Sequence, residues 1–251
     1  MTMTVKLSII TATWNSAATL PATLESLQAQ TCQDFESIVV DGGSTDNTVD
    51  IIQSSKVVDR WVSEKDQGIY DALNKGIAMA QGEYVGFMHS DDIYADDSSV
   101  QTLIDHIDKR HPDAVYADLN YVQKDDVSKV VRHWKSGQYM ASKLNWGWMP
   151  PHPTFYMKKS LYEQLGVFDL SYNIAADYDS LMRYLYVGGV QPDYIPEVLV
   201  KMRVGGASNR SLKNIIQKSQ EDISVMKAAG MPVIKALLGK NFSKIPQFFK
   251  K

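Results

Sequence analysis

The chain has a single cysteine, Cys32, among its 251 residues. One thiol cannot close an internal disulfide bond, which favours a reducing compartment. Long apolar runs are also lacking, and none approaches the roughly 18 uninterrupted residues of a membrane-spanning helix. The first residues, MTMTVKLSIITATWNS, lack the basic segment and the long apolar stretch of a secretion signal. We therefore expect a protein of the cytoplasm.

A strong overall charge is lacking as well. The formal net charge is −3, so no global field recruits nucleic acid or a membrane. No G-x-G-x-x-G follows the first predicted strand, which weighs against an NAD-dependent enzyme. Residues 11–15 at that position (TATWN) contain no glycine, whereas nucleotidyltransferases that make sugar nucleotides usually have a glycine-rich phosphate loop there. The length suits one α/β domain with a short appendage, or at most two small domains.

Strand and helix patterns alternate through the first half of the chain. Short apolar runs rich in β-branched residues predict buried strands. The predicted strands are 5–12, 35–40, 57–62 and 84–88. The predicted helices begin at Thr19-Leu20-Pro21, cover 45–53 and cover 69–80, with Gly82 as a C-cap. This order predicts a mostly parallel sheet with helices on both faces.

Polar residues follow each of these four strands, where ligands bind in such sheets. The strand ends are 11–15 (TATWN), 41–44 (DGGS), 64–68 (EKDQG) and 90–92 (SDD). Asp91 and Asp92 are candidates for holding Mg²⁺ or Mn²⁺, which prefer carboxylate, phosphate and water oxygens. A turn or helix N-cap is the alternative for this pair. For Asp41 the alternative is an Asx-turn, and for Asp66 a solvated loop charge.

The second half of the chain is less regular. Its predicted strands are 114–122, 129–134 and 194–203, and the first two are expected to pair. Its predicted helices are 159–165, 176–186 and 211–229, and an aromatic, proline-rich loop covers 144–153. The segment 176–186 (ADYDSLMRYLY) has apolar residues near helical spacing.

Four blocks of sequence occur in an order and spacing typical of one protein family. They are VKLSIITATWNS from Val5, IVVDGGSTD from Ile38, EKDQGIYDALNKG from Glu64 and EYVGFMHSDD from Glu83. Together they resemble the large family 2 of inverting glycosyltransferases with the GT-A fold, over residues 5–210. The resemblance implies an α/β GT-A domain at 1–210, with a mostly parallel central sheet flanked by helices. A nucleotide-sugar-binding half at 1–95 and an acceptor half at 96–210 would precede a helical, basic extension at 211–251.

The resemblance also implies roles for individual residues. Asp92 would bind a divalent cation, Mn²⁺ or Mg²⁺, and Asp91 would contact the donor. The family's acidic motif is often Asp-x-Asp, and Ser90 stands here in place of the first acid. The other residues implied around the nucleotide sugar are Thr11, Thr13, Asn15, Asp41, Glu64, Asp66, Asn74, Lys75 and Arg203.

Inverting transfer needs a carboxylate that takes the proton from the attacking hydroxyl. The family commonly has Glu-Asp at the start of a helix, followed by an Arg. Here Ala176-Asp177 and Arg183 match that pattern, so the resemblance implies Asp177 as the base, with Ala176 in place of the Glu. Asp179 is the rival, and at i and i+2 on a helix only one of the two should point into the site. A first-turn acid favoured by the helix dipole is the alternative for Asp177.

Trp148, His152 and Arg183 are expected on the acceptor side. Trp148 is suited to stacking on a sugar face, and burial in a loop core is its alternative. Arg203 is suited to pairing with phosphate, and a structural ion pair is its alternative. Processive family members carry a Gln-x-x-Arg-Trp motif and transmembrane helices, and neither occurs in this sequence. Their absence favours the addition of single sugars.

The end of the chain is basic. No acidic residue follows Asp222, whereas six lysines do. Across residues 233–249 apolar and basic side chains recur near helical spacing: Ile234, Leu238, Phe242, Ile245 and Phe249, flanked by Lys235, Lys240 and Lys244. A basic amphipathic helix of this kind suits an anionic membrane surface. A helix that packs on the domain with solvated lysines has the same period and is the alternative.

The sequence thus predicts a metal-dependent inverting glycosyltransferase. It would move one sugar from a nucleotide diphosphate sugar, a UDP-sugar, to a hydroxyl of a saccharide or lipid-linked saccharide during polysaccharide or glycolipid synthesis. We expect contact with the cytoplasmic face of the membrane through 233–249 and no nucleic-acid partner, and an oligomer is compatible with the sequence. The alternatives are a nucleotidyltransferase that forms sugar nucleotides and a non-catalytic nucleotide-sugar-binding protein.

Overall fold

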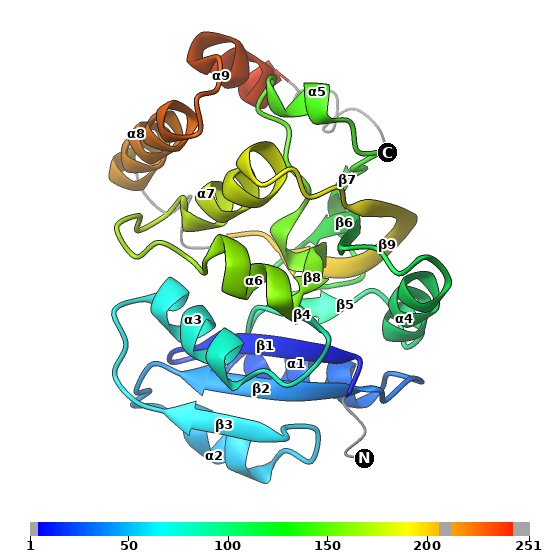
Figure 1. Ribbon diagram of the computed structural model, residues 1–251. Coiled ribbons are helices and arrows are strands. Elements are labelled where there is room, and N and C mark those ends of the chain that lie inside the picture. Colours follow the sequence, from blue (N-terminus) through cyan, green and yellow to red (C-terminus); the bar gives the residue numbers. More distant parts are fainter. Residues whose placement is uncertain (1–4, 206–211, 243–251) are drawn as a thin grey trace.

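A single sheet runs through the protein in the computed structural model, which describes residues 5–205 and 212–242 (Figure 1). Its first part is parallel, in the order β3-β2-β1-β4. These strands are β1 (Leu7–Thr13), β2 (Phe35–Asp41), β3 (Arg60–Ser63) and β4 (Tyr84–Phe87). Because the strands are parallel, their carboxyl ends meet at one edge.

The second part of the sheet mixes directions. β8 (Tyr156–Lys158) lies antiparallel between β4 and β6 (Ala114–Val122). β6 then pairs in parallel with β9 (Asp193–Arg203) and antiparallel with β7 (Val130–Trp134), while the short β5 (Ile93–Tyr94) pairs with β9. One continuous sheet therefore joins the predicted donor and acceptor halves.

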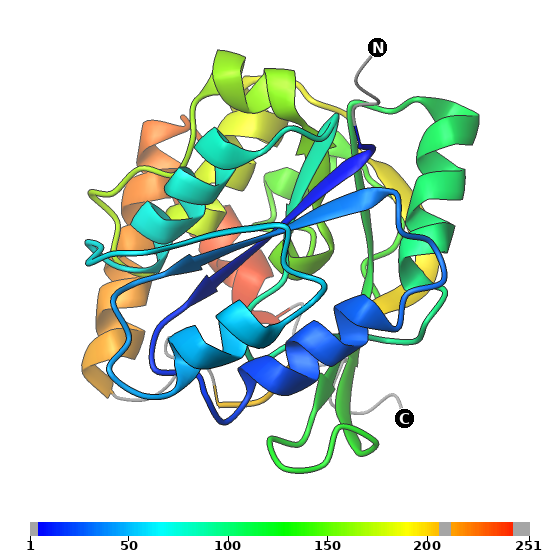
Figure 2. The same ribbon diagram turned by 90° about the horizontal axis from the view of Figure 1, so that it is seen from below.

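Helices cover both faces of the sheet (Figure 2). One face carries α1 (Leu20–Gln28), α2 (Thr48–Ser54) and α4 (Ser99–Arg110), and the other carries α3 (Ile69–Met79), α6 (Lys159–Leu165) and α7 (Ala176–Met182). Adjacent residues of β1 show the division, because Ile9 belongs to the core beneath α1 whereas Ile10 belongs to the core beneath α3. Both side chains are fully buried, so β1 is covered on both of its faces.

Most predicted elements are present, and some boundaries were wrong. Gly82 is not the C-cap of α3, which ends at Met79; the Gly82 N–H instead donates to Ser8 Oγ. The helix after Ala176 changes to a π-helical turn at Arg183–Val187. α4, β5 and β8 were not predicted. β8 fits beside β4 because Gly86 has no side chain, and a Cβ there would overlap the ring of Tyr156.

The C-terminal helices lie at the end of the molecule opposite β2 and β3 (Figure 1). α8 (Leu212–Ala228) packs on α7, and α9 (Val233–Phe242) packs on α8. α9 also rests on the segment after the short α5 (Ala141–Leu144), where a Cβ on Gly239 would overlap the carbonyl of Trp146. None of the helices in the described ranges is both long and apolar enough to cross a membrane. Residues 243–249 of the predicted tail lie outside the described residues.

Candidate active site

The carboxyl ends of β1, β2 and β3 meet in register at Asp41. Thr13 of β1 pairs with Asp41, which pairs in turn with Ser63 of β3. Asp41 is fully buried, and its Oδ2 accepts hydrogen bonds from Ser44 N at 2.9 Å, Gly43 N at 3.1 Å and Ser63 Oγ at 2.6 Å. These contacts are those of the Asx-turn considered for Asp41, and they hold the three strand ends together. Its contact with a nucleoside stays a prediction.

The loop after β1 is tied to the ends of β2 and β4. Asn15 adopts a left-handed backbone (φ 49°); its N–H donates to Ser44 Oγ at 2.7 Å, and its Oδ1 accepts from Thr45 N at 2.8 Å. Ser16 Oγ lies 3.0 Å from Ser90 Oγ. Hydrogen bonds therefore connect four strand ends into one surface, which we call the strand-end rim: residues 13–16, 41–44, 63–66 and 89–92.

Asp66 belongs to this rim and lies against the glycine turn. A Cβ on Gly42 would overlap the Asp66 carboxylate, so the close approach depends on glycine. Asp66 Oδ1 also accepts from Gly68 N at 2.9 Å. Nearby, Lys75 forms ion pairs with Glu64 at 2.8 Å and Asp71 at 3.4 Å. The sequence prediction placed Glu64, Asp66 and Lys75 in one pocket, and the ion pair joins Glu64 to Lys75.

The two carboxylates of the acidic pair after β4 differ in their exposure to solvent. Asp91 is partly exposed, whereas Asp92 is 1% exposed. Asp92 Oδ1 accepts from Arg203 N at 3.2 Å, and its shielded Oδ2 has no hydrogen-bond partner within the described part of the chain. Burial raises the pKa of Asp92 well above its usual value; the Asp91 charge adds to this, and Arg203 opposes it. Asp91 is thus the more accessible of the two acids.

Asp177 lies in the first turn of α7, and its charge acts on His89 and His152. Burial lowers the pKa of His89, and both Asp91 and Asp177 oppose that change. The rings of His89 and His152 lie 6.1 Å apart. His152 is 7% exposed and stacks on Phe87 at 5.0 Å. The charges of Asp91, from the predicted donor half, and of Asp177, from the predicted acceptor half, therefore both act on His89.

The rival acid, Asp179, is committed to a different contact. It is 6% exposed, and its Oδ2 accepts from Arg183 Nε at 2.8 Å. The two other guanidinium nitrogens of Arg183 donate to the carbonyls of Leu165 and Val167 at 2.8 and 2.7 Å. Arg183 thereby joins α7 to the end of α6. Asp177 is the acid of this helix that stays partly exposed, and its role as the base stays a prediction.

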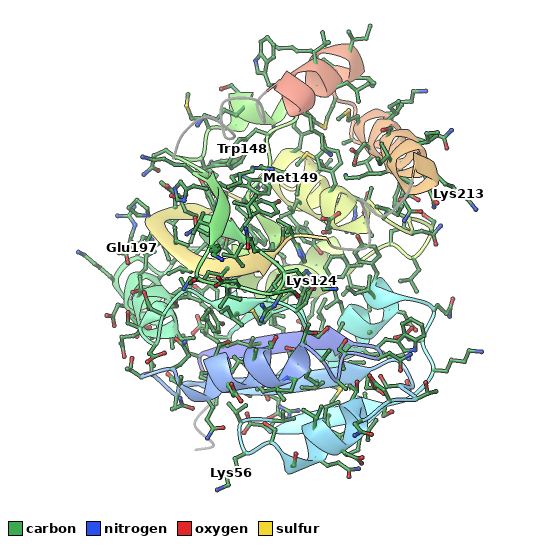
Figure 3. The ribbon with its side chains drawn as sticks, turned by 180° about the vertical axis from the view of Figure 1, so that it is seen from behind. Lys56, Lys124, Trp148, Met149, Glu197 and Lys213 are labelled. Atoms are coloured by element: carbon green, nitrogen blue, oxygen red, sulfur yellow. The ribbon has the colours of Figure 1, made fainter. Side chains whose placement is uncertain are left out.

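Two further predicted residues make structural contacts. The Asn74 amide donates to the Phe168 carbonyl and accepts from the Phe168 N–H, both at 2.9 Å. Trp148 packs against Tyr116 and Tyr139, and its Nε1 donates to the Ser136 carbonyl at 3.3 Å. Figure 3 shows Trp148 far from the β1–β3 end of the molecule. These contacts correspond to the loop-core alternative for Trp148.

The remaining predicted residues lie close to the rim. Thr11 and Thr13 are buried on β1, and their hydroxyls have no hydrogen-bond partner among residues 5–205 and 212–242. Arg203 ends β9, and one of its terminal guanidinium nitrogens donates to the Lys124 carbonyl at 3.2 Å. Roles for these residues in donor binding stay predictions.

Sequence reasoning missed several residues that organise the site. His89 lies inside the EYVGFMHSDD block, close before its two acids. Tyr70, in the IYDALNKG segment, donates from its hydroxyl to the Ile174 carbonyl at 2.7 Å. Glu221 of α8 accepts from the backbone just before α7. The motif blocks offered a signal for His89 and Tyr70, but no local pattern marks Glu221.

The α/β sheet with acidic strand ends and a second, acid-bearing half has the GT-A type of fold. The chain matches the family model Glycosyl transferase family 2 over residues 8–173. A PGL/p-HBAD biosynthesis glycosyltransferase of Mycobacterium bovis (strain BCG / Pasteur 1173P2) is 32% identical over 208 residues, or 80% of this chain and 78% of the relative. The chain belongs to glycosyl transferase family 2, and it is a glycosyltransferase.

Solved structures agree with this fold. Residues 1–349 of TarS from S. aureus match with a TM-score of 0.71 and 20% identity, covering 98% of this chain and 75% of that one. The same TarS fragment in complex with UDP-GlcNAc matches at 0.70, with 20% identity and 89% and 65% coverage. Mannosyltransferase PcManGT from Pyrobaculum calidifontis, in complex with GDP-Man and Mn²⁺, matches at 0.67, with 18% identity and 97% and 72% coverage.

Proposed function

We propose that this glycosyltransferase moves one sugar from a UDP-sugar to a hydroxyl of a saccharide or lipid-linked saccharide, with inversion at the anomeric carbon. The observation that carries the proposal is that the partly exposed Asp91 and Asp177 both act electrostatically on the buried His89, whose ring lies 6.1 Å from that of His152. One acid comes from the strand-end rim and the other from the acceptor half. A transferase that joins two substrates needs such a junction, because the acceptor hydroxyl must meet the anomeric carbon there.

Asp177 is the proposed base. It takes the proton from the acceptor hydroxyl while that oxygen forms a bond to the anomeric carbon. The bond between the anomeric carbon and the diphosphate oxygen breaks, and the nucleoside diphosphate leaves with the bonding electron pair. Asp177 is suited to this role because it is partly exposed, whereas Asp179 is buried against Arg183. Burial lowers the pKa of His152 to about 4. The His152 imidazole is therefore neutral at neutral pH and does not compete, as a cation, for the Asp177 carboxylate.

The acidic pair fits a divalent cation held largely by the donor. Within the described residues no three His, Cys, Asp or Glu side chains cluster as a self-sufficient metal site. Mg²⁺ and Mn²⁺ commonly rely on one or two carboxylates and take their other ligands from phosphate and water. When bound, the cation would neutralise charge on the departing diphosphate. Asp91 is the open carboxylate and the proposed ligand. The sequence assigned the ligand to Asp92, and the shielding of Asp92 Oδ2 weighs against it.

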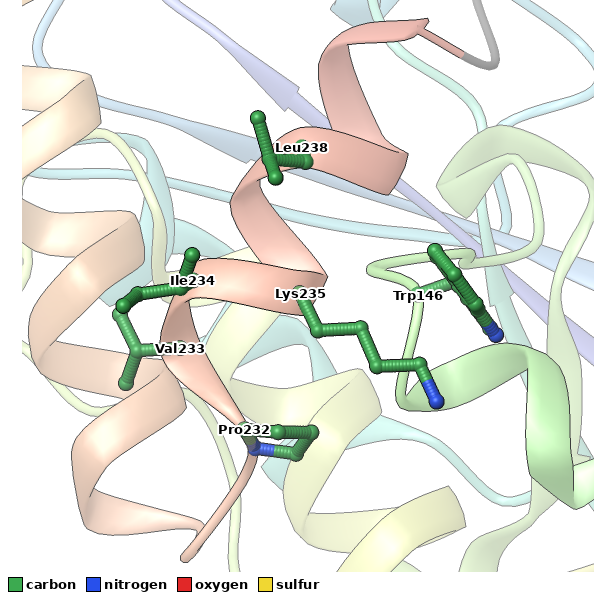
Figure 4. A pocket seen from close by; sticks show the side chains of 6 residues that line it. All are labelled: Trp146, Pro232, Val233, Ile234, Lys235 and Leu238. Atoms are coloured by element: carbon green, nitrogen blue, oxygen red, sulfur yellow. The ribbon is translucent and has the colours of Figure 1, made fainter.

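We propose that α9 brings the enzyme to a membrane surface where a lipid-linked acceptor lies. Ile234 and Leu238 are 78% and 52% exposed, and together with Trp146 and Lys235 they line an apolar hollow on the outside of α9 (Figure 4). The Lys235 ammonium lies 4.4 Å from the Trp146 ring centre. Lys240, predicted as a flanking lysine, instead faces inward and pairs with Asp222 at 2.9 Å. α9 therefore packs on the domain through one face and leaves an apolar face open.

Donor binding is the test of this function. Thermal unfolding would be followed with UDP, GDP and their sugar conjugates, each with and without Mn²⁺. A ligand at about 100 times its Kd stabilises the folded state by about 2.7 kcal/mol. We expect UDP and one UDP-sugar to raise the midpoint, and Mn²⁺ to enlarge the rise. The stabilising donor is then tested for transfer to a lipid-linked saccharide. Stabilisation by GDP alone would contradict the UDP assignment, and no response to any donor would contradict the function.

A further inference from the structure

Glu221 of α8 binds the backbone that leads into the helix of the proposed base. Its Oε2 accepts from the N–H groups of Ile174 and Ala175, both at 2.8 Å. Its Oε1 accepts from the N–H of Asn173 at 3.2 Å and from Gln217 Nε2 at 2.9 Å. One carboxylate thus receives three consecutive backbone N–H groups immediately before α7.

These contacts reach the N-cap residue of α7 and the two residues before it. The residue at its N-cap position is Ala175, which has no side-chain oxygen to accept a backbone N–H. Asp177 instead accepts from the N–H of its neighbour Tyr178 at 2.7 Å. Burial raises the pKa of Glu221, but the donors from Ile174, Ala175, Gln217 and Asn173 outweigh it, so the pKa lies below its usual value. Glu221 is therefore a carboxylate stabilised in its charged form by this segment.

The same segment is held from a second side. The Tyr70 hydroxyl, on α3, donates to the Ile174 carbonyl at 2.7 Å. The residue three positions before Asp177 thus has its N–H bound to α8 and its C=O bound to α3. α3 packs on β1 and β2. These contacts therefore fix the start of α7 relative to the strand-end rim.

We propose that Glu221 is a positioning residue for sugar transfer: by fixing residues 173–175 it sets the orientation of Asp177 toward the acceptor hydroxyl. The inference rests on the proposed role of Asp177 as the base. It extends the catalytic unit beyond the family match at residues 8–173 to α8. A displacement of a reacting group by about 1 Å can cost about a hundredfold in rate, so a loosened clamp should lower kcat without altering the distant nucleotide contacts.

Two substitutions at Glu221 separate loss of the clamp from loss of charge. Glu221→Ala removes every acceptor, whereas Glu221→Gln keeps one side-chain oxygen. We expect Glu221→Ala to lower kcat at least tenfold and leave the donor KM within about twofold. Glu221→Gln should recover most of that loss. Amide hydrogen exchange across residues 173–178 should speed up in Glu221→Ala and less in Glu221→Gln.

Val225→Ala is the matched control for a merely structural role. Val225 is 1% exposed and lies on α8, so its truncation loosens α8 without removing the Glu221 carboxylate. At an equal loss of Tm, Val225→Ala should keep kcat within about threefold of the parent enzyme. An equal loss of kcat in Val225→Ala, an unchanged kcat in Glu221→Ala, or no recovery in Glu221→Gln would each overturn the inference. If Glu221→Ala does not fold, Glu221→Asp takes its place, because its shorter side chain withdraws the carboxylate from residues 173–175 and keeps the charge. A kcat and a hydrogen exchange that both stay unchanged from the parent in Glu221→Asp would overturn the inference.

Asp177→Asn separates this inference from the function on which it rests. If Asp177→Asn transfers sugar at the parent rate, the proposed base is wrong whatever Glu221 does. If Asp177→Asn is inactive while Glu221→Ala keeps its kcat, the base stands and only the positioning role falls.

Discussion

Arg183 and Asp179 form a closed pair on α7, with Nε donating to Oδ2 at 2.8 Å, and the pair takes Asp179 out of contention as the base. The same guanidinium reaches two carbonyls at the end of α6. The sequence placed Arg183 beside the acceptor, whereas each of its three guanidinium nitrogens donates to a group within the protein. We interpret Arg183 as the link that fixes α7 against α6.

Arg183→Ala should therefore be a stability change first. It leaves the buried Asp179 carboxylate and two carbonyls without a donor, which we expect to cost roughly 2–4 kcal/mol of unfolding free energy. Urea denaturation measures it. Arg110→Ala is the control, because Arg110 pairs with Asp193 but is 58% exposed, and such pairs contribute about 0–1 kcal/mol. Equal losses in the two variants would contradict the structural role of Arg183.

Asp91→Asn and Asp92→Asn should differ in their effect on cation binding. We expect Asp91→Asn to abolish the Mn²⁺ dependence of UDP binding and to lower transfer at least a hundredfold. Asp92→Asn should keep that dependence and cost little stability, because burial already favours the uncharged form of Asp92. Calorimetry with UDP and Mn²⁺ measures both. If Asp92→Asn abolished the Mn²⁺ dependence and Asp91→Asn kept it, Asp92 would be the cation ligand.

His152 should make the protein sensitive to acid. Its folded pKa of about 4 lies below the ordinary 6.5, chiefly because of burial. Below pH 6.5 His152 binds a proton in the unfolded chain but stays neutral in the folded chain. Its contribution to the free energy of unfolding is therefore fully present above pH 6.5 and is lost as the pH falls toward 4. The full loss is about 3 kcal/mol at roughly 1.4 kcal/mol per pKa unit. Urea denaturation at pH 7, 5.5 and 4.5 gives the free energy of unfolding at each pH. The slope of this free energy against pH should be shallower in His152→Phe than in the parent enzyme. Identical slopes would contradict the buried neutral imidazole.

The open face of α9 should direct binding to anionic lipid. The enzyme should co-sediment with vesicles of phosphatidylglycerol, and a smaller fraction should co-sediment with vesicles of phosphatidylcholine. Ile234→Ser with Leu238→Ser should weaken binding about tenfold or more. The control is Val130→Ser with Val131→Ser, which changes two valines that are 52% and 50% exposed on β7. Unchanged binding in the α9 variant, or self-association through α9 in place of lipid binding, would contradict the proposal.

The sequence predicted the donor half of this fold well because the information there is local. Apolar runs such as 35–40 predicted the parallel strands, and polar strand ends such as Asp41 predicted the rim. The acceptor half depends on pairings between distant segments. β8 has three residues and no pattern of its own, and it is a strand only because β4 and β6 lie on either side.

The contacts of individual site residues were less predictable for the same reason. Asn74 stands in a recognisable block, yet its partner Phe168 lies 94 residues away. Glu221 lies 46 residues from Ala175. It stands on a predicted helix for which the sequence indicated no site residue. Side-chain types indicated which residues were able to bind a ligand, but tertiary packing decided which were already committed within the protein.

Sugar transfer by Asp177→Asn is the most direct test of the account. Binding of UDP with Mn²⁺ is measured by calorimetry, and transfer of the sugar is measured on the same preparation. We predict binding within about twofold of the parent enzyme and a transfer rate at least a hundred times lower, because the base contributes about 10²–10⁴-fold and does not contact the nucleotide. Transfer at the parent rate with intact binding would contradict the account.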